Sequence, residues 1–379
     1  MKNFGHVFSL AIALMCMVSC ASEQQSKEVI QNYAALVLDN YEAARQDAVL
    51  LKEAIGKFTT KPSEATHQAA KDAWKKARES YGITEVFRFQ EGPIDVIEGE
   101  EGPEARLNAW PLDESYIDYV EIDSTAGIIN APSKTLDKAS LTAANESGGE
   151  KNISIGYHAI EFLLWGQDLS PPGIKQAGSR PHTDFVDGGT AANQDRRRVY
   201  LQLCADLLLD DLQLLIDQWK EGGAYRNKFF AMEHKTALSK MMTGMATLAK
   251  AELAGERIFV AYDNQDQEDE HSCFSDNTHR DTRLNLQGIK NVYFSLIQGK
   301  ENQSIHDLVQ SQDTTLAREV SNAFELAEQA VNSTAIPFDF AITADTERPK
   351  VLAAVEALEK LGDKVAEAGA VLNVKVGME

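Results

Sequence analysis

Two ionisable side chains lie in the otherwise apolar segment ISIGYHAIEFLLWGQD, residues 153–168. Between Ile153 and Trp165, only His158 and Glu161 can change charge near neutral pH, and they are three residues apart. On a helix this spacing puts both side chains on one face, where an unpaired buried carboxylate would be strongly destabilising. A metal ion, a cationic side chain or a proton must therefore satisfy it. Helical bundles use such carboxylate–histidine pairs as metal ligands; the alternative is a buried His–Glu hydrogen bond closed by an arginine.

A second group of residues could provide partners for this pair. One predicted stripe of a helix carries, at helical spacing, Trp74, Arg78, Tyr81, Glu85 and Arg88. The charged members lie beside small and apolar residues, which indicates a buried polar network. Arg78, Glu85 and Arg88 are therefore candidate supporting residues of the site. The alternative is a solvated amphipathic edge, although the aromatic residues of the stripe argue against full exposure.

A third candidate is the polar segment EDEHSCFSDNTHRD, residues 268–281. Glu268 and His271 are three residues apart, and so are Asp276 and His279. Carboxylates, imidazoles and hydroxyls at this density could bind a metal ion or another ligand. A loop held by side-chain turns and helix caps would explain the same composition equally well. Asp276 and His279 are the residues of this loop that we expect to support the site.

The elements that position these residues are predicted to be helices. Apolar residues recur at helical spacing throughout the chain, and the predicted helices cover 27–56, 63–90, 193–221, 234–262, 283–299, 312–334 and 346–370. Ser63 is a suitable N-cap for the second of them. No run of alternating residues is long enough to predict a sheet. The expected fold class is therefore all-α, built from helical bundles.

The chain also divides into two halves of similar outline. Each half opens with two long predicted helices, and the sequence LVLDN at 36–40 is echoed by LLLDD at 207–211. A long loop rich in glycine and proline separates the halves. We therefore predict an N-terminal bundle over 27–190 and a C-terminal bundle over 191–379, related by internal duplication.

The charge balance limits the class of partner. The 379 residues carry a net charge of −21, whereas nucleic-acid binding requires a basic surface. We therefore expect no nucleic-acid partner. The acidic balance is compatible with a protein that attracts cations.

The N-terminus predicts export and a lipid anchor. Lys2 precedes a short apolar run that ends in small residues, which is typical of a secretory signal peptide over 1–20. The ending MVSC resembles a bacterial lipobox, in which Cys20 becomes the lipidated first residue of the mature chain. No aspartate follows Cys20, so the outer membrane is the expected destination; the alternative is a soluble periplasmic protein. Cys204 and Cys273 could form a disulfide, although Cys204 fits an apolar helix core better.

Several uncommon strings resemble the imelysin-like family in their order along the chain. They are TEVFR at 84–88, NAWPLDESYIDY at 108–119, GYHAIEFLLWGQD at 156–168 with its GxHxxE motif, SRPHTDF at 179–185 and HSCFSDNTH at 271–279. The resemblance covers most of the chain after residue 27. One departure is His182, where family members often carry tyrosine.

This resemblance implies an all-helical fold of two duplicated bundles with the site between them. It identifies Gly156, His158 and Glu161 as the motif residues. It also implies a periplasmic or surface location connected with iron uptake. The family includes both insulin-cleaving membrane proteases and iron-regulated proteins, so the resemblance allows a binding role or a peptidase role.

Three functions remain open from the sequence. The first is a lipid-anchored protein that binds a metal ion, expected to be iron, or a metal-bearing ligand through His158 and Glu161, with iron-uptake components as partners. The second is a metal-dependent peptidase in which Glu161 acts as base on a metal-bound water. The chain has no HExxH motif, so a peptidase would need further ligands from elsewhere. The third is a polar cluster that only locks the two bundles together.

Overall fold

The computed structural model describes the backbone of residues 4–377 and the side chains of residues 23–377. Its longer helices are α1 (Phe4–Thr60), α2 (Glu64–Gly82), α7 (Gln194–Trp219), α9 (His234–Thr247), α11 (Thr278–Tyr293), α13 (Thr314–Ser333) and α15 (Arg348–Val371). Its shorter α-helices are α3 (Glu104–Leu107), α4 (Glu114–Ile117), α5 (Lys138–Ala144), α6 (Tyr157–Trp165), α8 (Ala224–Phe230), α10 (Val260–Asn264), α12 (Ile305–Gln312) and α14 (Phe338–Thr343). The two strands form a short hairpin, β1 (Val96–Ile97) with β2 (Glu100–Glu101). The predicted all-α class is confirmed.

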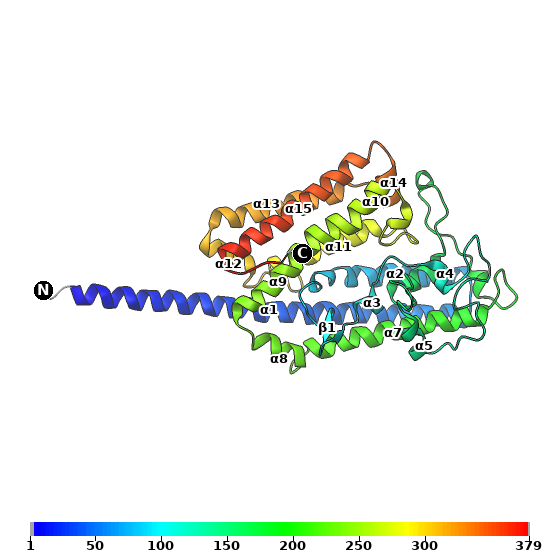
Figure 1. Cartoon of the computed structure of the whole chain (residues 1–379), viewed down its shortest axis with the longest axis horizontal. Coiled ribbons are helices and arrows are strands. Elements are labelled where there is room, and N and C mark those ends of the chain that lie inside the picture. The colour runs from blue at the N-terminus through cyan, green and yellow to red at the C-terminus, as the bar shows by residue number, and fades with distance from the viewer. Residues whose placement is uncertain (1–3, 378–379) are drawn as a thin grey trace.

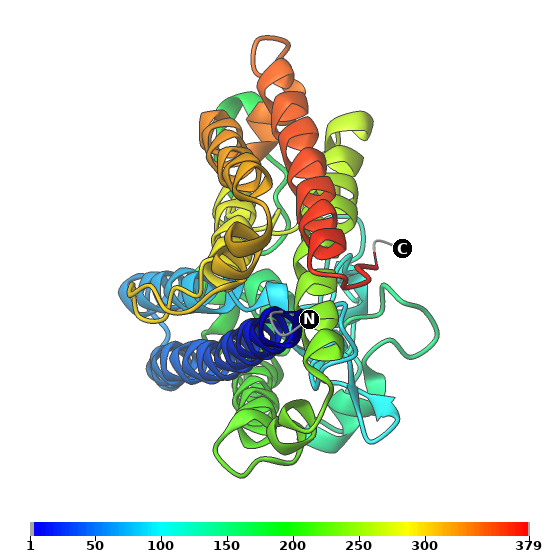
Figure 2. The ribbon, with the colours of Figure 1, turned by 90° about the vertical axis from the view of Figure 1, so that its left-hand side faces the viewer.

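The helices gather into two packed groups. In the first group α1 packs along α2 and α7 (Figure 1). Helix α6 lies against α2 and α7. In the second group α15 packs against α13, α9 and the π-helix η4 (Leu248–Phe259) that lies between α9 and α10. Viewed end-on, the yellow-to-red helices of the second group lie above the blue helices and the green α7 (Figure 2). Helix α7 begins after residue 190 and packs in the first group; the domain division and the duplication stay predictions.

The second predicted helix is wrong in its length. Ser63 caps α2 as expected, in a capping box with Thr66, but the helix ends at Gly82 rather than near residue 90. The Thr84 hydroxyl donates to the carbonyl of Tyr81 at 2.7 Å and so satisfies one of the C-terminal carbonyls that a helix end leaves free. Glu85 then lies in a separate 3-10 turn, η1 (Glu85–Phe87), and does not continue the stripe of α2.

The predicted helix over 234–262 contains a π-helical segment. α9 continues as the π-helix η4 (Leu248–Phe259) and then as α10. In an α-helix, residues five apart point away from each other, whereas the wider π turn brings them to one side. Glu252 and Arg257 are five apart, and Arg257 Nε donates to Glu252 Oε1 at 2.9 Å. The π-helix therefore presents a charged pair toward the first helix group.

The predicted signal peptide over 1–20 and the lipidation of Cys20 lie outside the residues whose side chains are described. In the described part of the chain, no helix combines the length and the apolar character needed to span a membrane. Cys204 and Cys273 are both buried and free, so the disulfide considered from the sequence is not formed. The thiol of Cys204 lies close to the Ser154 carbonyl in the core, as expected for a small buried residue.

Candidate functional site

Gly156 sets the start of the helix that carries the GxHxxE motif. It lies directly before α6 with φ of 94°, a left-handed conformation that glycine adopts without strain. A Cβ atom at this position would lie 2.7 Å from the Leu107 carbonyl oxygen and 2.8 Å from that of Arg106. The close approach holds the start of α6 against the segment that ends at Asn108. Gly156 therefore fixes the position of the motif relative to Asn108, whose side chain accepts from Arg78.

His158 and Glu161 form a direct contact inside the protein. His158 Nδ1 and Glu161 Oε2 are 2.9 Å apart, and both side chains are fully buried. The other carboxylate oxygen of Glu161 accepts from the backbone N–H of Ser275 at 3.0 Å and from its hydroxyl at 2.6 Å. His158 Nε2 is buried and has no hydrogen-bond partner among the described residues. The pair thus leaves one imidazole nitrogen unsatisfied in the core.

Burial shifts both members of the pair toward their neutral forms. It raises the pKa of Glu161 to about 8, although the hydrogen bonds from Ser275 and the charge of Arg78 oppose the shift. It lowers the pKa of His158 well below its ordinary value, and the neighbouring His271 lowers it further. Near neutral pH, His158 is therefore neutral and Glu161 is largely protonated. The two groups share a hydrogen bond, so their titration belongs to the pair.

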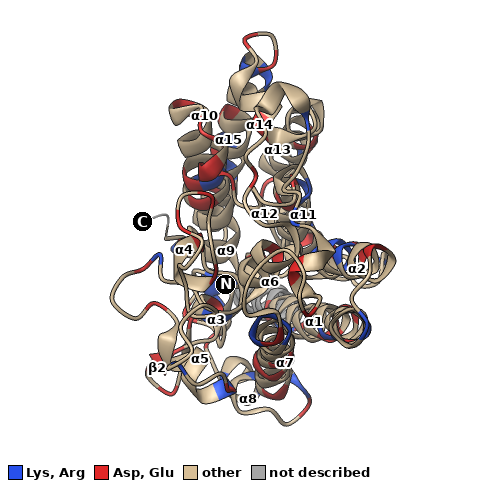
Figure 3. Cartoon of the chain, turned by 90° about the vertical axis from the view of Figure 1, so that its right-hand side faces the viewer, with Lys and Arg blue, Asp and Glu red and all other residues tan. Residues whose placement is uncertain are grey.

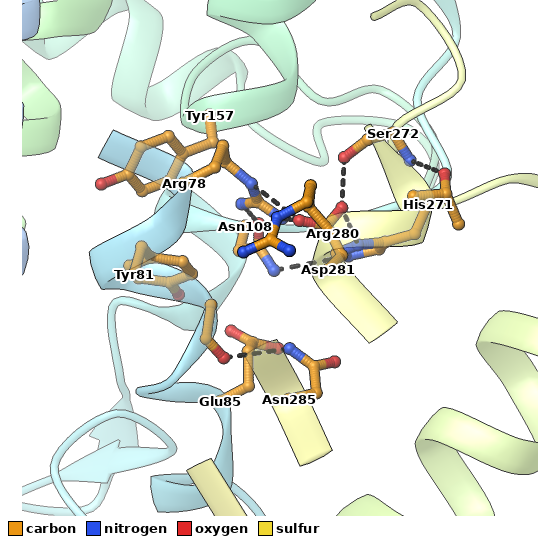
Figure 4. Close-up of polar contacts among 12 residues, drawn as sticks. Arg78, Tyr81, Glu85, Asn108, Tyr157, His271, Ser272, Arg280, Asp281 and Asn285 are labelled. Atoms are coloured by element: carbon orange, nitrogen blue, oxygen red, sulfur yellow. Dashed lines mark hydrogen bonds and ion pairs between the residues drawn. The ribbon is translucent and has the colours of Figure 1, made fainter. Parts of the chain in front are cut away.

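A buried polar network around His271, drawn in Figure 4, lies next to this pair. The rings of His158 and His271 meet edge to face, with 4.7 Å between their centroids. His271 Nδ1 lies 3.1 Å from Asp281 Oδ2, and Arg78 Nη2 donates to Asp281 Oδ1 at 3.0 Å. Arg78 also donates to the Asn108 side chain. The arginine neutralises Asp281 and, with His271, holds the pKa of that carboxyl well below its usual range, although burial alone would raise it.

A second charged group lies between η1 and the π-helix. Glu85 Oε2 accepts from Arg257 at 2.6 Å and from Arg88 at 3.1 Å. These arginines lower the pKa of Glu85 to about 2, against the opposing effect of burial. Arg257 also donates to the Asn285 side chain at 2.7 Å, while Glu85 Oε1 has no partner in the part of the chain that is described. The ionised Glu85 therefore binds the first helix group to the second.

An acidic pocket of about 480 Å³ is lined in part by residues of the network. Asn108, Trp110 and His271 line it together with two arginines, Arg88 and Arg257. Its carboxylates are Glu104, Glu146, Glu150, Glu252, Glu256 and Asp269. The ring of Trp110 lies 5.0 Å from that of His158, so the motif histidine lies next to two of the lining rings, Trp110 and His271. Acidic positions are also spread over both helix groups (Figure 3). Such a pocket attracts cations.

The structure brings together three of the five predicted supporting residues. Arg78 belongs to the network of His271 and Asp281, while Glu85 and Arg88 meet in the neighbouring charged group. Asp276 lies elsewhere, in a cluster of carboxylates. His279 Nδ1 contacts the backbone carbonyl of Asp276 at 3.0 Å within its own loop.

Sequence reasoning missed the direct partners of the motif. The polar loop was a correct signal for His271, which pairs with Asp281 rather than with Glu268. Ser275 reaches Glu161 partly through its backbone N–H, a contact that residue type does not reveal. The sequence did not indicate that Arg257 would reach the site, because the direction of its side chain depends on the π-helix.

A separate buried ion network joins two of the strings that carried the family resemblance. Asp118 Oδ2 accepts from Arg180 at 2.5 Å and from Arg197 at 2.6 Å, and all three side chains are buried. Tyr119 donates to Asp184 at 2.5 Å. Every charged group here has a partner, which is the condition for a stable buried ion network. These residues therefore hold the loops around α6 in place.

The chain is similar to known proteins over most of its length. The sequence profile of the imelysin peptidase family matches residues 37–365. Iron-regulated protein A of Synechococcus elongatus is 23% identical over 351 residues, covering 89% of this chain and 84% of that protein. A crystal structure from Parabacteroides distasonis, provisionally described as an iron-regulated protein A precursor, has a TM-score of 0.71 at 20% identity and covers 92% of this chain and 95% of that one. At this identity the structural likeness shows the fold alone.

Proposed function

Because this chain belongs to the imelysin family, we propose that it is a cell-envelope protein that binds an iron ion through His158, with Glu161 orienting the histidine ring. The name of its relative, iron-regulated protein A, supports an iron-related role. The predicted signal peptide and the lipidation of Cys20 would place it at the outer membrane, where iron-uptake components are its expected partners. A metal-bearing ligand could present the ion to the same side chains.

The unpartnered nitrogen of His158 is the observation that carries this proposal. A buried polar atom without a partner is costly, and His158 Nε2 is such an atom. Imidazole nitrogen is a preferred ligand for iron and related transition metals. Glu85 Oε1, also buried and unpartnered, offers a further oxygen from the neighbouring charged group. His271 Nε2, whose contact with the Asn108 amide is a long 3.4 Å, could be released as another ligand.

The His158–Glu161 pair links metal binding to proton release. With Glu161 protonated, its hydroxyl donates to His158 Nδ1, and the proton of the neutral ring lies on Nε2. Loss of one proton lets Nδ1–H donate to the carboxylate and leaves the Nε2 lone pair free. Glu161 then fixes the tautomer of His158, as carboxylates beside metal-binding histidines do. Binding should therefore release about one proton.

Metal analysis of the purified protein tests this proposal. Chelator-treated protein is loaded with ferrous iron without oxygen, and bound iron is measured after desalting. We expect about one tightly bound ion that is lost in His158→Ala. His234→Ala is the matched control, because His234 is only half-buried and lies at the start of α9. Equal iron content in wild type and His158→Ala would contradict the proposal; loss in both variants would show that the effect is not specific to the motif.

A further inference from the structure

A second group of acidic side chains lies apart from the pocket described above. Asp168, Asp276 and Asp339 each present a carboxylate oxygen, and these oxygens lie within 4.8 Å of one another. They come from three distant segments: the loop after α6, the polar loop before α11 and the start of α14. Asp168 and Asp339 are buried, at 3% and 2% exposure, and Asp276 is half-buried. Tertiary structure alone brings them together.

A fourth buried carboxylate, that of Glu270, interacts electrostatically with all three aspartates of this group and is itself unsatisfied. Glu270 is 1% exposed, and neither of its carboxylate oxygens has a hydrogen-bond partner of normal geometry in the described structure. Burial raises the pKa of Glu270 well above its ordinary value, and the negative charges of Asp339, Asp276 and Asp168 raise it further. The Thr278 hydroxyl lowers this pKa only in part. A buried, unpartnered carboxylate beside three others is an independent sign that a positive ligand belongs here.

The protein itself supplies little positive charge to the group. Lys75 and Lys175 act on Asp276 and Asp339 respectively, yet the pKa of Asp276 is still raised to about 7 and that of Asp339 to about 6 by burial and mutual repulsion. The Lys175 ammonium lies over the Phe340 ring, 3.7 Å from its centroid, and no ion pair between either lysine and these carboxylates is found among the described residues. The repulsion is therefore largely uncompensated.

We propose that Asp168, Asp276 and Asp339 bind a divalent cation of calcium size, and that the nearby Glu270 carboxylate adds negative charge that favours the cation. The donors are all oxygens, with no imidazole or thiolate, which suits a hard divalent cation better than ferrous iron. Calcium lies at 2.3–2.6 Å from its ligands, so oxygens on opposite sides of it are about 4.6–5.2 Å apart. The observed separations, all within 4.8 Å, fit around such an ion.

One member of the group, Asp168, also lines a groove at the surface. The groove has a volume of about 480 Å³ and is also lined by Asp266, Glu268 and Thr343. The added carboxylates make the groove acidic, so it would concentrate cations at its wall. This groove is separate from the pocket that His271 lines.

The cation would also stabilise the loop that positions Glu161 beside His158. Asp276 directly follows Ser275, whose N–H and hydroxyl bind Glu161, while Asp339 belongs to the second helix group through α14 and α15. An ion held by both would tie the loop that orients Glu161 to α14. The calcium site does not depend on iron binding at His158, because the two sites have separate donors.

Calcium titration of the purified full chain tests the site. Calorimetry of chelator-treated protein with calcium chloride should show one site with a Kd on the order of 0.1–1 mM, the range of extracellular calcium modules. Millimolar calcium should also raise the unfolding temperature by a few degrees. Asp339→Asn should weaken binding at least tenfold and abolish the calcium-dependent rise. Without calcium, the same variant should unfold at a higher temperature than wild type, because it removes one of the repelling charges.

Two further variants make the result decisive. Asp276→Asn should reproduce the loss, since asparagine tolerates the left-handed backbone of Asp276, φ 57°. Asp345→Asn, at an exposed position after α14, is the matched control and should bind calcium as wild type does. No heat and no thermal shift with wild type would overturn the proposal, as would calcium binding that survives in both Asp339→Asn and Asp276→Asn. His158→Ala should retain calcium binding, which separates this site from the iron site.

Discussion

The pH dependence of metal affinity gives the most detailed test of the His158–Glu161 pair. Burial raises the pKa of Glu161 to about 8 and keeps His158 neutral. From this pKa, about half of the Glu161 population is ionised at pH 8 and about 1% at pH 6. If metal binding requires ionised Glu161, the apparent affinity should fall roughly 50-fold between these two pH values. A carboxylate with an ordinary pKa would produce almost no change over the same range.

Calorimetry measures both the affinity and the protons released. Titrations with zinc, a redox-inert probe, and with ferrous iron under anaerobic conditions are repeated in buffers of different ionisation enthalpy. We expect about one proton released per ion near pH 7. Glu161→Gln keeps the size and the polarity of the side chain but cannot ionise, so its residual binding should release no proton. A pH-independent affinity in wild type, or equal proton release in Glu161→Gln, would refute the reasoning.

Four other predictions concern the site: three address the core around the motif and one addresses peptidase activity. Arg78→Met should destabilise the fold by about 3–5 kcal/mol in urea unfolding, because it leaves Asp281 buried and unpaired; a loss below 1 kcal/mol would show that the pair is not buried in solution. Since the pKa of Asp281 is lowered by folding, its stabilising effect is present at neutral pH and is lost in acid. The stability difference between wild type and Asp281→Asn should therefore shrink below about pH 4, and a difference that grows in acid would contradict the sign. Gly156→Ala should cost at least about 1 kcal/mol, because its Cβ would meet the Leu107 carbonyl at positive φ; an unchanged Tm would contradict this. Unfolded polypeptides should remain intact with the metal-loaded protein, whereas cleavage that disappears with chelator and in Glu161→Gln would support the peptidase alternative.

The local part of the site could be predicted from the sequence. His158 and Glu161 are three apart in an apolar helix, and period alone places both on one buried face. Helix α6 and the direct contact between the two side chains follow from this pattern. The N-cap of the second helix could also be predicted, because Ser63 directly precedes a run of residues with helical periodicity.

The tertiary part could not be predicted from the sequence. Glu161 binds Ser275, and Arg78 binds Asp281, across more than 100 residues in each case. No periodic pattern encodes such a pairing. The second helix was predicted too long because the turn at Thr84 depends on a local side-chain bond to a helix carbonyl. The helical periodicity of the sequence continues beyond Gly82, so it does not indicate that the helix ends there.

The position of the Asp276 side chain could not be predicted from sequence spacing either. Its spacing from His279 indicated a shared role near His158, and the loop does approach Glu161 through Ser275. The neighbouring Asp276 carboxylate, however, meets Asp168 and Asp339. Its position is decided by the left-handed turn of the loop and by the placement of α14, both of which are properties of the folded chain.

The position of a bound ion tests the central claim most directly. Crystals grown with iron and measured on both sides of the iron absorption edge give an anomalous difference map that locates the metal. We predict a peak within coordination distance of His158 Nε2, on the side of the ring away from the Nδ1 atom that contacts Glu161. A well-occupied iron peak elsewhere, with none next to His158 Nε2, would contradict the account.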